Sequence, residues 1–158
     1  MTNRYKLALA KSYIMPYVRA WFHLVWSTKY RQPLLTKTIR QRVFDHIKLN
    51  AKRKGIFLER VNGYDDHVHC LLSLSTDQAI SKIVQLIKGE SSFWIKKEKL
   101  CAGRFEWQEE YFAISVSYSH LSGVREYIDN QERHHQKKTS QQEYEEFIRN
   151  YEFEEKGN

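Results

Sequence analysis

The sequence has little cysteine and no long apolar run. It contains two cysteines in 158 residues, and Cys70 lies in the apolar row of an expected strand, so we expect no disulfide framework and a reducing compartment. Apolar stretches stay far shorter than a membrane span, and we therefore expect a cytoplasmic protein with no membrane partner. A glycine-rich loop that cradles phosphates is missing as well, which argues against nucleotide hydrolysis as an energy source.

Positive charge, by contrast, is abundant. The chain carries 26 Lys and Arg against 19 Asp and Glu, a formal net charge of +7. Hydrophobic residues make up 41% and aromatic residues 14%, which is typical of a globular protein with a core. Acidic residues gather between Glu143 and Glu155, so the earlier part of the chain is more basic still. This balance suits a polyanion such as nucleic acid, although a protein that is merely soluble and basic has the same composition.

We expect one domain, over residues 17–151, because no internal repeat, low-complexity segment or second boundary interrupts the chain. Residues 1–16 are expected to form a loose N-terminal leader, since lysines separate short apolar pairs and no convincing signal peptide results. Residues 152–158 are expected to form an acidic tail.

Hydrophobic periodicity and turn residues predict four strands and four helices. The strands are expected at 17–28, 56–61, 65–74 and 112–117. The helices are expected at 36–55, at 75–99 with an interruption at Gly89, at 119–135, and from a capping box of Ser140 and Glu143 onward. Asn62-Gly63 is a strong hairpin signal, so the second and third strands should pair antiparallel.

The order strand, helix, strand, strand, helix, strand, followed by further helices, is typical of an α+β protein with a ferredoxin-like fold. Its four-stranded antiparallel sheet should carry two helices on one face and leave the other face available. A C-terminal helix carrying Tyr127 should follow the sheet.

The strand at 65–74 carries two histidines at i and i+2. Successive strand side chains point to opposite faces, so His67 and His69 should lie exposed side by side while the apolar residues between them enter the core. Two adjacent imidazoles are half of a divalent-metal site. Two surface histidines on a half-buried strand would show the same spacing, and spacing alone leaves both interpretations open.

A tyrosine and a glutamine in the third expected helix are candidates to complete such a site. Tyr127 and Gln131 are four residues apart and therefore share a helix face. A phenolic oxygen is a possible nucleophile toward phosphorus, and an amide oxygen is a possible third metal ligand. Ordinary packing of Tyr127 beside Val124 and Ile128 is the alternative. The two histidines that follow, His134-His135, receive no role.

The stretch 66–69, followed by Leu71-Leu72, and the stretch 127–131 resemble the single-tyrosine HUH transposases. These small enzymes move bacterial insertion sequences, of the 200/605 type, as single-stranded DNA. The stretches 21–29, 88–92 and 105–108 match as well, so the likeness spans roughly residues 17 to 148. The chain is also similar to the related REP-associated tyrosine transposases, which are not mobile.

The resemblance implies both a site and a reaction. A divalent metal, Mg or Mn, is expected on His67, His69 and Gln131. Tyr127 is expected to attack a phosphodiester of single-stranded DNA at hairpin-bearing element ends, which forms a 5′-phosphotyrosine and a free 3′-OH, and the reverse step joins strands. The family works as a homodimer, so Tyr127 acts either on its own chain's site or on the partner's.

Six basic residues are expected to contact DNA phosphates, although each by itself is also an ordinary solvated charge: Lys29, Arg31, Lys52, Arg53, Lys54 and Lys88. Two other functions stay open on the residues alone. One is a non-catalytic single-stranded nucleic-acid-binding module that uses the available sheet face. The other is a metal-dependent phosphodiesterase that uses water and leaves Tyr127 idle. A covalent protein–DNA adduct distinguishes the transposase from both.

Overall fold

The structure is a computed structural model that describes residues 18–150. The expected leader (1–16) and tail (152–158) lie outside the described residues. The strands are β1 (Ala20–Ser27), β2 (Phe57–Gly63), β3 (His67–Leu74) and β4 (Phe112–Val116). The helices are α2 (Arg40–Arg53), α3 (Ile80–Lys97), α4 (Leu121–Asp129), α5 (Gln131–His135) and α6 (Ser140–Asn150), with 3-10 turns at Lys29–Arg31 and Tyr118–His120.

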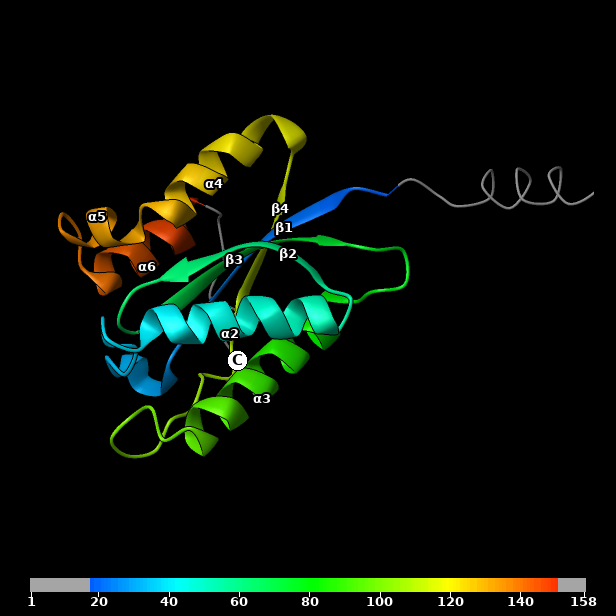
Figure 1. The fold of residues 1–158 in the computed structure, drawn as a ribbon. Helices are drawn as coiled ribbons and strands as arrows, with labels where there is room; N and C mark the ends of the chain where they lie inside the picture. The colour runs from blue at the N-terminus through cyan, green and yellow to red at the C-terminus, as the bar shows by residue number, and fades with distance from the viewer. Residues whose placement is uncertain (1–17, 151–158) are drawn as a thin grey trace, which may run out of the picture.

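The four strands form one antiparallel sheet in the spatial order β2-β3-β1-β4. Together with the order of elements along the chain, this is the ferredoxin-like α+β arrangement expected from the sequence. β1 and β3 are the central strands, and their register places Val25 opposite His69 and Ser27 opposite His67. Figure 1 shows α2 and α3 on one side of the sheet and α4, α5 and α6 grouped on the other.

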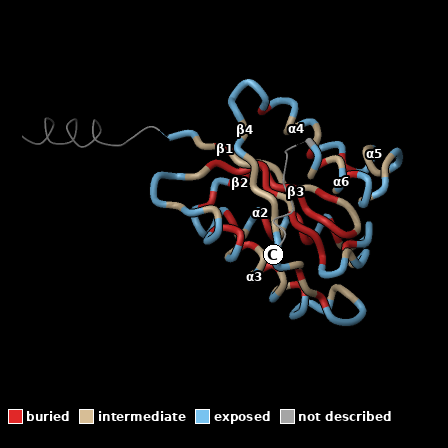
Figure 2. The backbone as a smooth tube through the Cα atoms, turned by 180° about the vertical axis from the view of Figure 1, so that it is seen from behind, coloured by how far each residue is buried: buried red, intermediate tan, exposed pale blue. Residues whose placement is uncertain are grey.

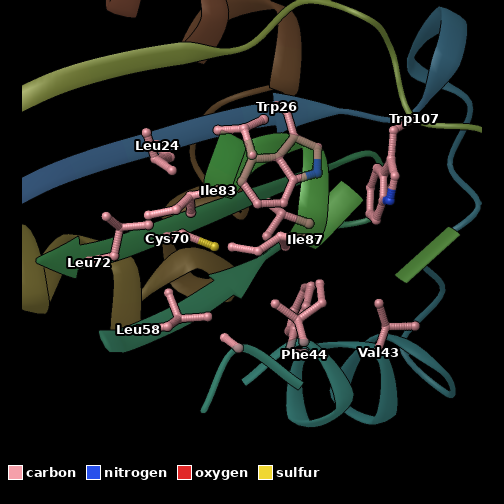
Figure 3. Close-up of a cluster of buried hydrophobic side chains, with 14 of the residues drawn as sticks. Leu24, Trp26, Val43, Phe44, Leu58, Cys70, Leu72, Ile83, Ile87 and Trp107 are labelled. Atoms are coloured by element: carbon pink, nitrogen blue, oxygen red, sulfur yellow. The ribbon is translucent and has the colours of Figure 1, made fainter. Parts of the chain in front are cut away.

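The sheet face under α2 and α3 holds the main hydrophobic core. Leu24 and Trp26 of β1 lie in one buried cluster with Cys70 and Leu72 of β3, as the alternation within each strand predicts. Phe44 of α2 enters the same cluster, which Figure 3 shows. Burial of one large apolar side chain contributes about 1.5–3 kcal/mol, so this cluster holds β3 firmly against the two helices.

The opposite sheet face is covered too, which corrects the expectation that it is available. Trp21 of β1 and Leu71 of β3 pack against Leu121 and Ile128 of α4. The physical reason is that α4 is amphipathic, and its apolar stripe is stabilised only when a second apolar surface covers it. In Figure 2 the buried positions run along the strands, and β3 is buried at every residue except Leu74. A nucleic-acid-binding module that uses an open sheet face therefore does not fit this fold.

The turn between β2 and β3 lies at residues 65–66, three residues later than Asn62-Gly63 indicates. β2 runs through Gly63, and the backbone N–H of Tyr64 donates to the carbonyl of His67 at 3.1 Å. Gly63 is required for another reason: a Cβ at this position would lie 2.1 Å from the carbonyl oxygen of His67. Asn62 is also used elsewhere, since its amide donates to the carbonyl of Ile128 at 2.8 Å and joins the hairpin to α4.

Two expected helices differ from the structure. α3 begins at Ile80 and runs without interruption through Gly89, because its buried stripe continues on both sides of the glycine. The expected helix at 119–135 is broken at Asn130, which leaves the helical region at φ −101° and ψ 24° and separates α4 from α5. Within residues 18–150 no helix is long and apolar enough to cross a membrane.

Candidate metal centre and nucleophile

The first histidine of β3 is held by a carboxylate. His67 is 4% exposed, and its Nδ1 lies 2.7 Å from Oδ1 of Asp66. A carboxylate only accepts hydrogen bonds, so Nδ1 carries a proton and Nε2 is turned into the site. Burial works to raise the pKa of Asp66, but the hydrogen bonds from His67 and from Ser140 of α6 outweigh it and lower that pKa.

The second histidine of β3, His69, is held by His23 of β1, a residue to which the sequence analysis gave no role. Nδ1 of His69 lies 3.0 Å from Nε2 of His23 in β1. Burial and the neighbouring imidazole lower the pKa of His23 to about 3, and burial lowers that of His69 to about 4, so both rings are neutral at pH 7. His69 is 1% exposed, and among the described residues its Nε2 has no hydrogen-bond partner. The expectation that both imidazoles of β3 are exposed was therefore wrong.

Gln131 lies in the same site despite the helix break before it. Its Nε2 donates to the carbonyl of Tyr127 at 3.2 Å, which turns its Oε1 toward Nε2 of His67, also at 3.2 Å. The side chain is fully buried. The structure therefore brings the two histidines and the glutamine together, as the sequence predicts. The break at Asn130 is tolerated because the turn keeps Gln131 beneath Tyr127.

Glu143 of α6 belongs to the site, although the sequence analysis assigned it to a helix cap. We expected it to form a capping box with Ser140, but the box is formed one residue earlier. The backbone N–H of Thr139 donates to Oε1 of Gln142 at 3.0 Å, and that of Gln142 donates to Oγ1 of Thr139 at 3.2 Å. The sequence 139–143 fits both boxes, and only packing selects between them.

The carboxylate of Glu143 lies among imidazoles. Its Oε2 is 2.7 Å from Nε2 of His135 and 3.4 Å from Nε2 of His67, and its Oε1 is 3.5 Å from Nε2 of His69. Burial works to raise the pKa of Glu143, but the contacts with His135 and His69 outweigh it and hold that pKa well below its usual value. Glu143 is therefore a buried anion at the centre of the site.

His135, which received no role from the sequence, faces the site from α5. Its Nε2 lies 3.2 Å from Nε2 of His67. A signal for it was present, because Tyr127, Gln131 and His135 follow one another at intervals of four residues. His23 offered no comparable signal, since the pairing register of β1 with β3 depends on the whole sheet.

The hydroxyl of Tyr127 donates to Oε1 of Glu143 in the same chain. The tyrosine ring lies 5.4 Å from the ring of His69 and 5.2 Å from that of His134, measured between centroids. Tyr127 also packs as an ordinary apolar side chain, because its ring lies against the small cluster that contains Ile128. Burial and then the charge of Glu143 raise the pKa of Tyr127, so its hydroxyl is protonated at neutral pH.

The donor set fits a divalent cation. The ligand atoms of His67, His135 and Glu143 all lie within 4.8 Å of one another. Four buried side-chain nitrogens in the described residues lack a hydrogen-bond partner, and three of them belong to His69, His134 and His135. Buried polar atoms without partners are costly, and a bound ion removes that cost at nitrogens that face it.

Two cavities flank Glu143. One of about 620 Å³ is bounded by His67 and His69, by Arg31, and by the aromatic rings of Phe112 and Tyr144. The other, of about 320 Å³, is bounded on the far side by residues of β1, α4, α5 and α6: His23, Val124, Tyr127, His134 and Phe147. Glu143 lines both, so the site can be approached from two sides.

The six basic residues expected on DNA do not form one surface. Arg31 lies at the larger cavity, where it donates to the carbonyl of Ser140 at 2.9 Å and sits over the ring of Tyr144. Lys29 pairs with Glu106 at 2.9 Å. Lys88 is used internally, since its Nζ donates to backbone carbonyls at 108–110.

The remaining three, Lys52, Arg53 and Lys54, are exposed at the end of α2. Arg40, at the start of the same helix, pairs with Asp65 beside the site. Fourteen residues of helix extend about 20 Å, so the three cations lie about that far from Arg40.

The protein is therefore an α+β protein with a candidate metal site. In that site a buried cluster of imidazoles, one carboxylate and one amide surrounds the hydroxyl of a tyrosine. Comparison with known families agrees. Residues 17–131 match the family described as "Transposase IS200 like". The chain therefore belongs to the IS200-like transposase family. It is a transposase, which is a DNA-cleaving enzyme, and members of this family depend on a metal.

Individual relatives support the assignment. The chain is 31% identical over 116 residues to the ISDra2 transposase TnpA of Deinococcus radiodurans, which covers 70% of this chain and 82% of that protein. A crystal structure of a candidate transposase from Deinococcus radiodurans superposes with a TM-score of 0.56 at 26% identity, over 73% of this chain and 93% of that one. A REP-associated tyrosine transposase bound to a REP hairpin shares the fold, with a TM-score of 0.53 at 16% identity, over 73% and 67% of the two chains.

Proposed function

We propose that this transposase cleaves and rejoins single-stranded DNA at hairpin-bearing element ends through a 5′-phosphotyrosine intermediate. The observation that carries the proposal is that the hydroxyl of Tyr127 lies in one buried cluster with His67, His69 and Gln131. A nucleophile and a set of metal ligands at the same place can act on a single phosphodiester.

The proposed ligands of the divalent metal, Mg or Mn, are His67, His69 and Gln131. When bound, the ion neutralises charge on the scissile phosphate and orients it. Asp66 and His23 hold the two imidazoles so that each Nε2 faces the cluster. The Nε2 of Gln131 donates to the carbonyl of Tyr127, and this hydrogen bond keeps the amide oxygen directed toward His67.

Tyr127 is the proposed nucleophile. Its oxygen forms a bond to phosphorus, the bond from phosphorus to the 3′-oxygen breaks, and that oxygen takes up a proton to become the free 3′-OH. The carboxylate of Glu143, to which the hydroxyl already donates, is the nearest acceptor for the tyrosine proton. Joining is the reverse reaction, in which a 3′-OH attacks the phosphotyrosine and releases Tyr127.

The proposed substrate is a DNA hairpin with a single-stranded flank. The net charge of +7 and the placement of Arg31 at the larger cavity support a polyanion, and a structural relative is bound to a REP hairpin. Action in the cytoplasm stays a prediction. The homodimer also stays a prediction, and light scattering of the purified chain tests it. The contact of Tyr127 with its own chain's site favours action in cis.

The proposal is tested with Tyr127→Phe, which removes one oxygen and keeps the ring. End-labelled hairpin DNA is incubated with protein and Mg²⁺ and resolved by denaturing electrophoresis, and the adduct is mapped by mass spectrometry. The wild type should form a covalent adduct on Tyr127, and Tyr127→Phe should bind DNA without forming it. Tyr118→Phe is the matched control, because Tyr118 is 86% exposed just before α4.

Two results would contradict the proposal. An adduct in Tyr127→Phe would mean that another residue is the nucleophile. Cleavage by the wild type without any adduct would mean that water attacks, and the function would then be that of a metal-dependent phosphodiesterase.

A further inference from the structure

Glu143 is the most connected polar side chain of the site, although the family match ends at residue 131, before it. Its two oxygens contact imidazoles that come from β3 and α5, and one of them also accepts from Tyr127. Only 8% of its side chain is exposed. A carboxylate loses much hydration on such burial, so its position needs a compensating positive charge.

Hydrogen bonds supply only part of that compensation. Nδ1 of His67 donates to Asp66, and its Nε2 faces Oε2 of Glu143 at 3.4 Å. The Nε2 of His69 faces Oε1 at 3.5 Å without a hydrogen bond. Oε1 of Gln131, which is also an acceptor, points at the same nitrogen of His67. Acceptor atoms that converge in this way repel one another unless protons on the imidazoles or a cation among them offset the repulsion.

The spacing of the atoms of His67, Gln131 and Glu143 matches that of ligands around one ion. Metal–ligand bonds of about 2.0–2.1 Å place neighbouring ligands about 3.3 Å apart in a tetrahedron and about 3.0 Å apart in an octahedron. The Nε2 of His67 lies 3.2 Å from the amide oxygen of Gln131 and 3.4 Å from Oε2 of Glu143. His69 approaches the carboxylate from another side, with its Nε2 3.5 Å from the second oxygen, Oε1, and it does not belong to the group of His67, His135 and Glu143 whose ligand atoms all lie within 4.8 Å of one another.

The start of α6 is fixed by contacts of the residues just before Glu143. The Thr139–Gln142 box satisfies the first backbone groups of the helix. The hydroxyl of Ser140 donates to Asp66 at 3.0 Å, so the residue that orients His67 also anchors α6. These contacts make Glu143 a preorganised group rather than a surface carboxylate that happens to fold inward.

We propose that Glu143 is itself a ligand of the divalent ion, in addition to the two histidines of β3 and Gln131. This inference rests on the proposed function, because it concerns the same metal centre. The three other ligands are neutral, so Glu143 supplies the only negative charge in the set and lowers the net charge of the bound centre from +2 to +1. It also joins α6 to the ion, so α6 is part of the metal centre.

The test is Mn²⁺ binding to the full chain, measured without DNA by the loss of the free-ion paramagnetic resonance signal. Glu143→Gln keeps the shape and removes the charge, and it should weaken Mn²⁺ binding about tenfold or more, since even residues behind the ligands cost 10–100-fold. Glu146→Gln, one turn along α6 and paired with Lys138 at the surface, is the matched control and should bind as the wild type does. Tyr127→Phe should also bind normally, which separates a ligand role of Glu143 from its contact with the tyrosine.

His67→Ala is measured in parallel, and circular dichroism establishes that each variant is folded. If Glu143→Gln binds Mn²⁺ within twofold of the wild type while His67→Ala has lost binding, Glu143 is not a ligand and the metal centre stands without it. If His67→Ala also binds normally, the metal centre itself is wrong, and the proposed function fails together with this inference. Weakened binding in Glu143→Gln but not in Glu146→Gln or Tyr127→Phe supports the ligand role.

Discussion

Asp66 links the metal centre to α6, and replacing it with asparagine tests whether that link matters. Asp66→Asn keeps the shape of the side chain and removes its charge. The hydrogen bonds with His67, at 2.7 Å, and with Ser140, at 3.0 Å, then become bonds to a neutral amide. A hydrogen bond to a charged group contributes about 1.5–3 kcal/mol and a neutral one about 0.5–1.5 kcal/mol, so each bond weakens by about 1 kcal/mol.

Two bonds weakened by about 1 kcal/mol each would lower the unfolding free energy by about 2 kcal/mol. Burial of the charge opposes this loss, because burial works to raise the pKa of Asp66, and a neutral amide no longer carries that cost. We therefore expect a loss of about 1 kcal/mol in the apoprotein, measured by urea unfolding.

The effect on metal binding should be larger than the effect on folding. Without the carboxylate, Nδ1 of His67 is no longer held as a strong donor, so Nε2 becomes a poorer ligand. We expect Mn²⁺ binding to weaken about 10–100-fold, measured by calorimetric titration. Asp45→Asn, at an exposed position of α2, is the control. Wild-type Mn²⁺ affinity in Asp66→Asn would refute the reasoning that the carboxylate prepares His67 for the ion.

Two further predictions follow from the hairpin and from the charge. Gly63→Ala would place a Cβ 2.1 Å from the carbonyl of His67. We expect it to lower the unfolding free energy by about 1–3 kcal/mol and to impair Mn²⁺ binding, because the backbone that carries His67 must move. Thermal unfolding measures this, and Gly123→Ala, where a Cβ meets nothing within 4 Å, should not lower the unfolding free energy. The affinity for DNA should fall by about 0.7 log units for each phosphate contact with a single strand, for each tenfold rise in salt. A salt-independent affinity, or tighter binding to plain duplex, would contradict the proposed substrate.

Local patterns in the sequence predict most of the elements and the face of each strand on which a side chain lies. Strand alternation separates His67 and His69 from Cys70 and Leu72, and the structure confirms this division. The four-residue spacing of Tyr127 and Gln131 likewise holds across a helix break that the spacing itself does not reveal. These features depend on backbone geometry over a few residues, and they can therefore be inferred from the chain alone.

Which distant residues complete the site depends on tertiary packing. His23 reaches His69 because β1 pairs with β3 in one register. The sequence 139–143 contains two overlapping capping boxes of equal local quality, and the choice of Thr139 and Gln142 releases Glu143 into the site. Local propensity cannot distinguish these alternatives, because their difference in free energy comes from contacts with residues 70 or more positions away. The same holds for the second sheet face, which α4 covers once its apolar stripe meets Trp21 and Leu71.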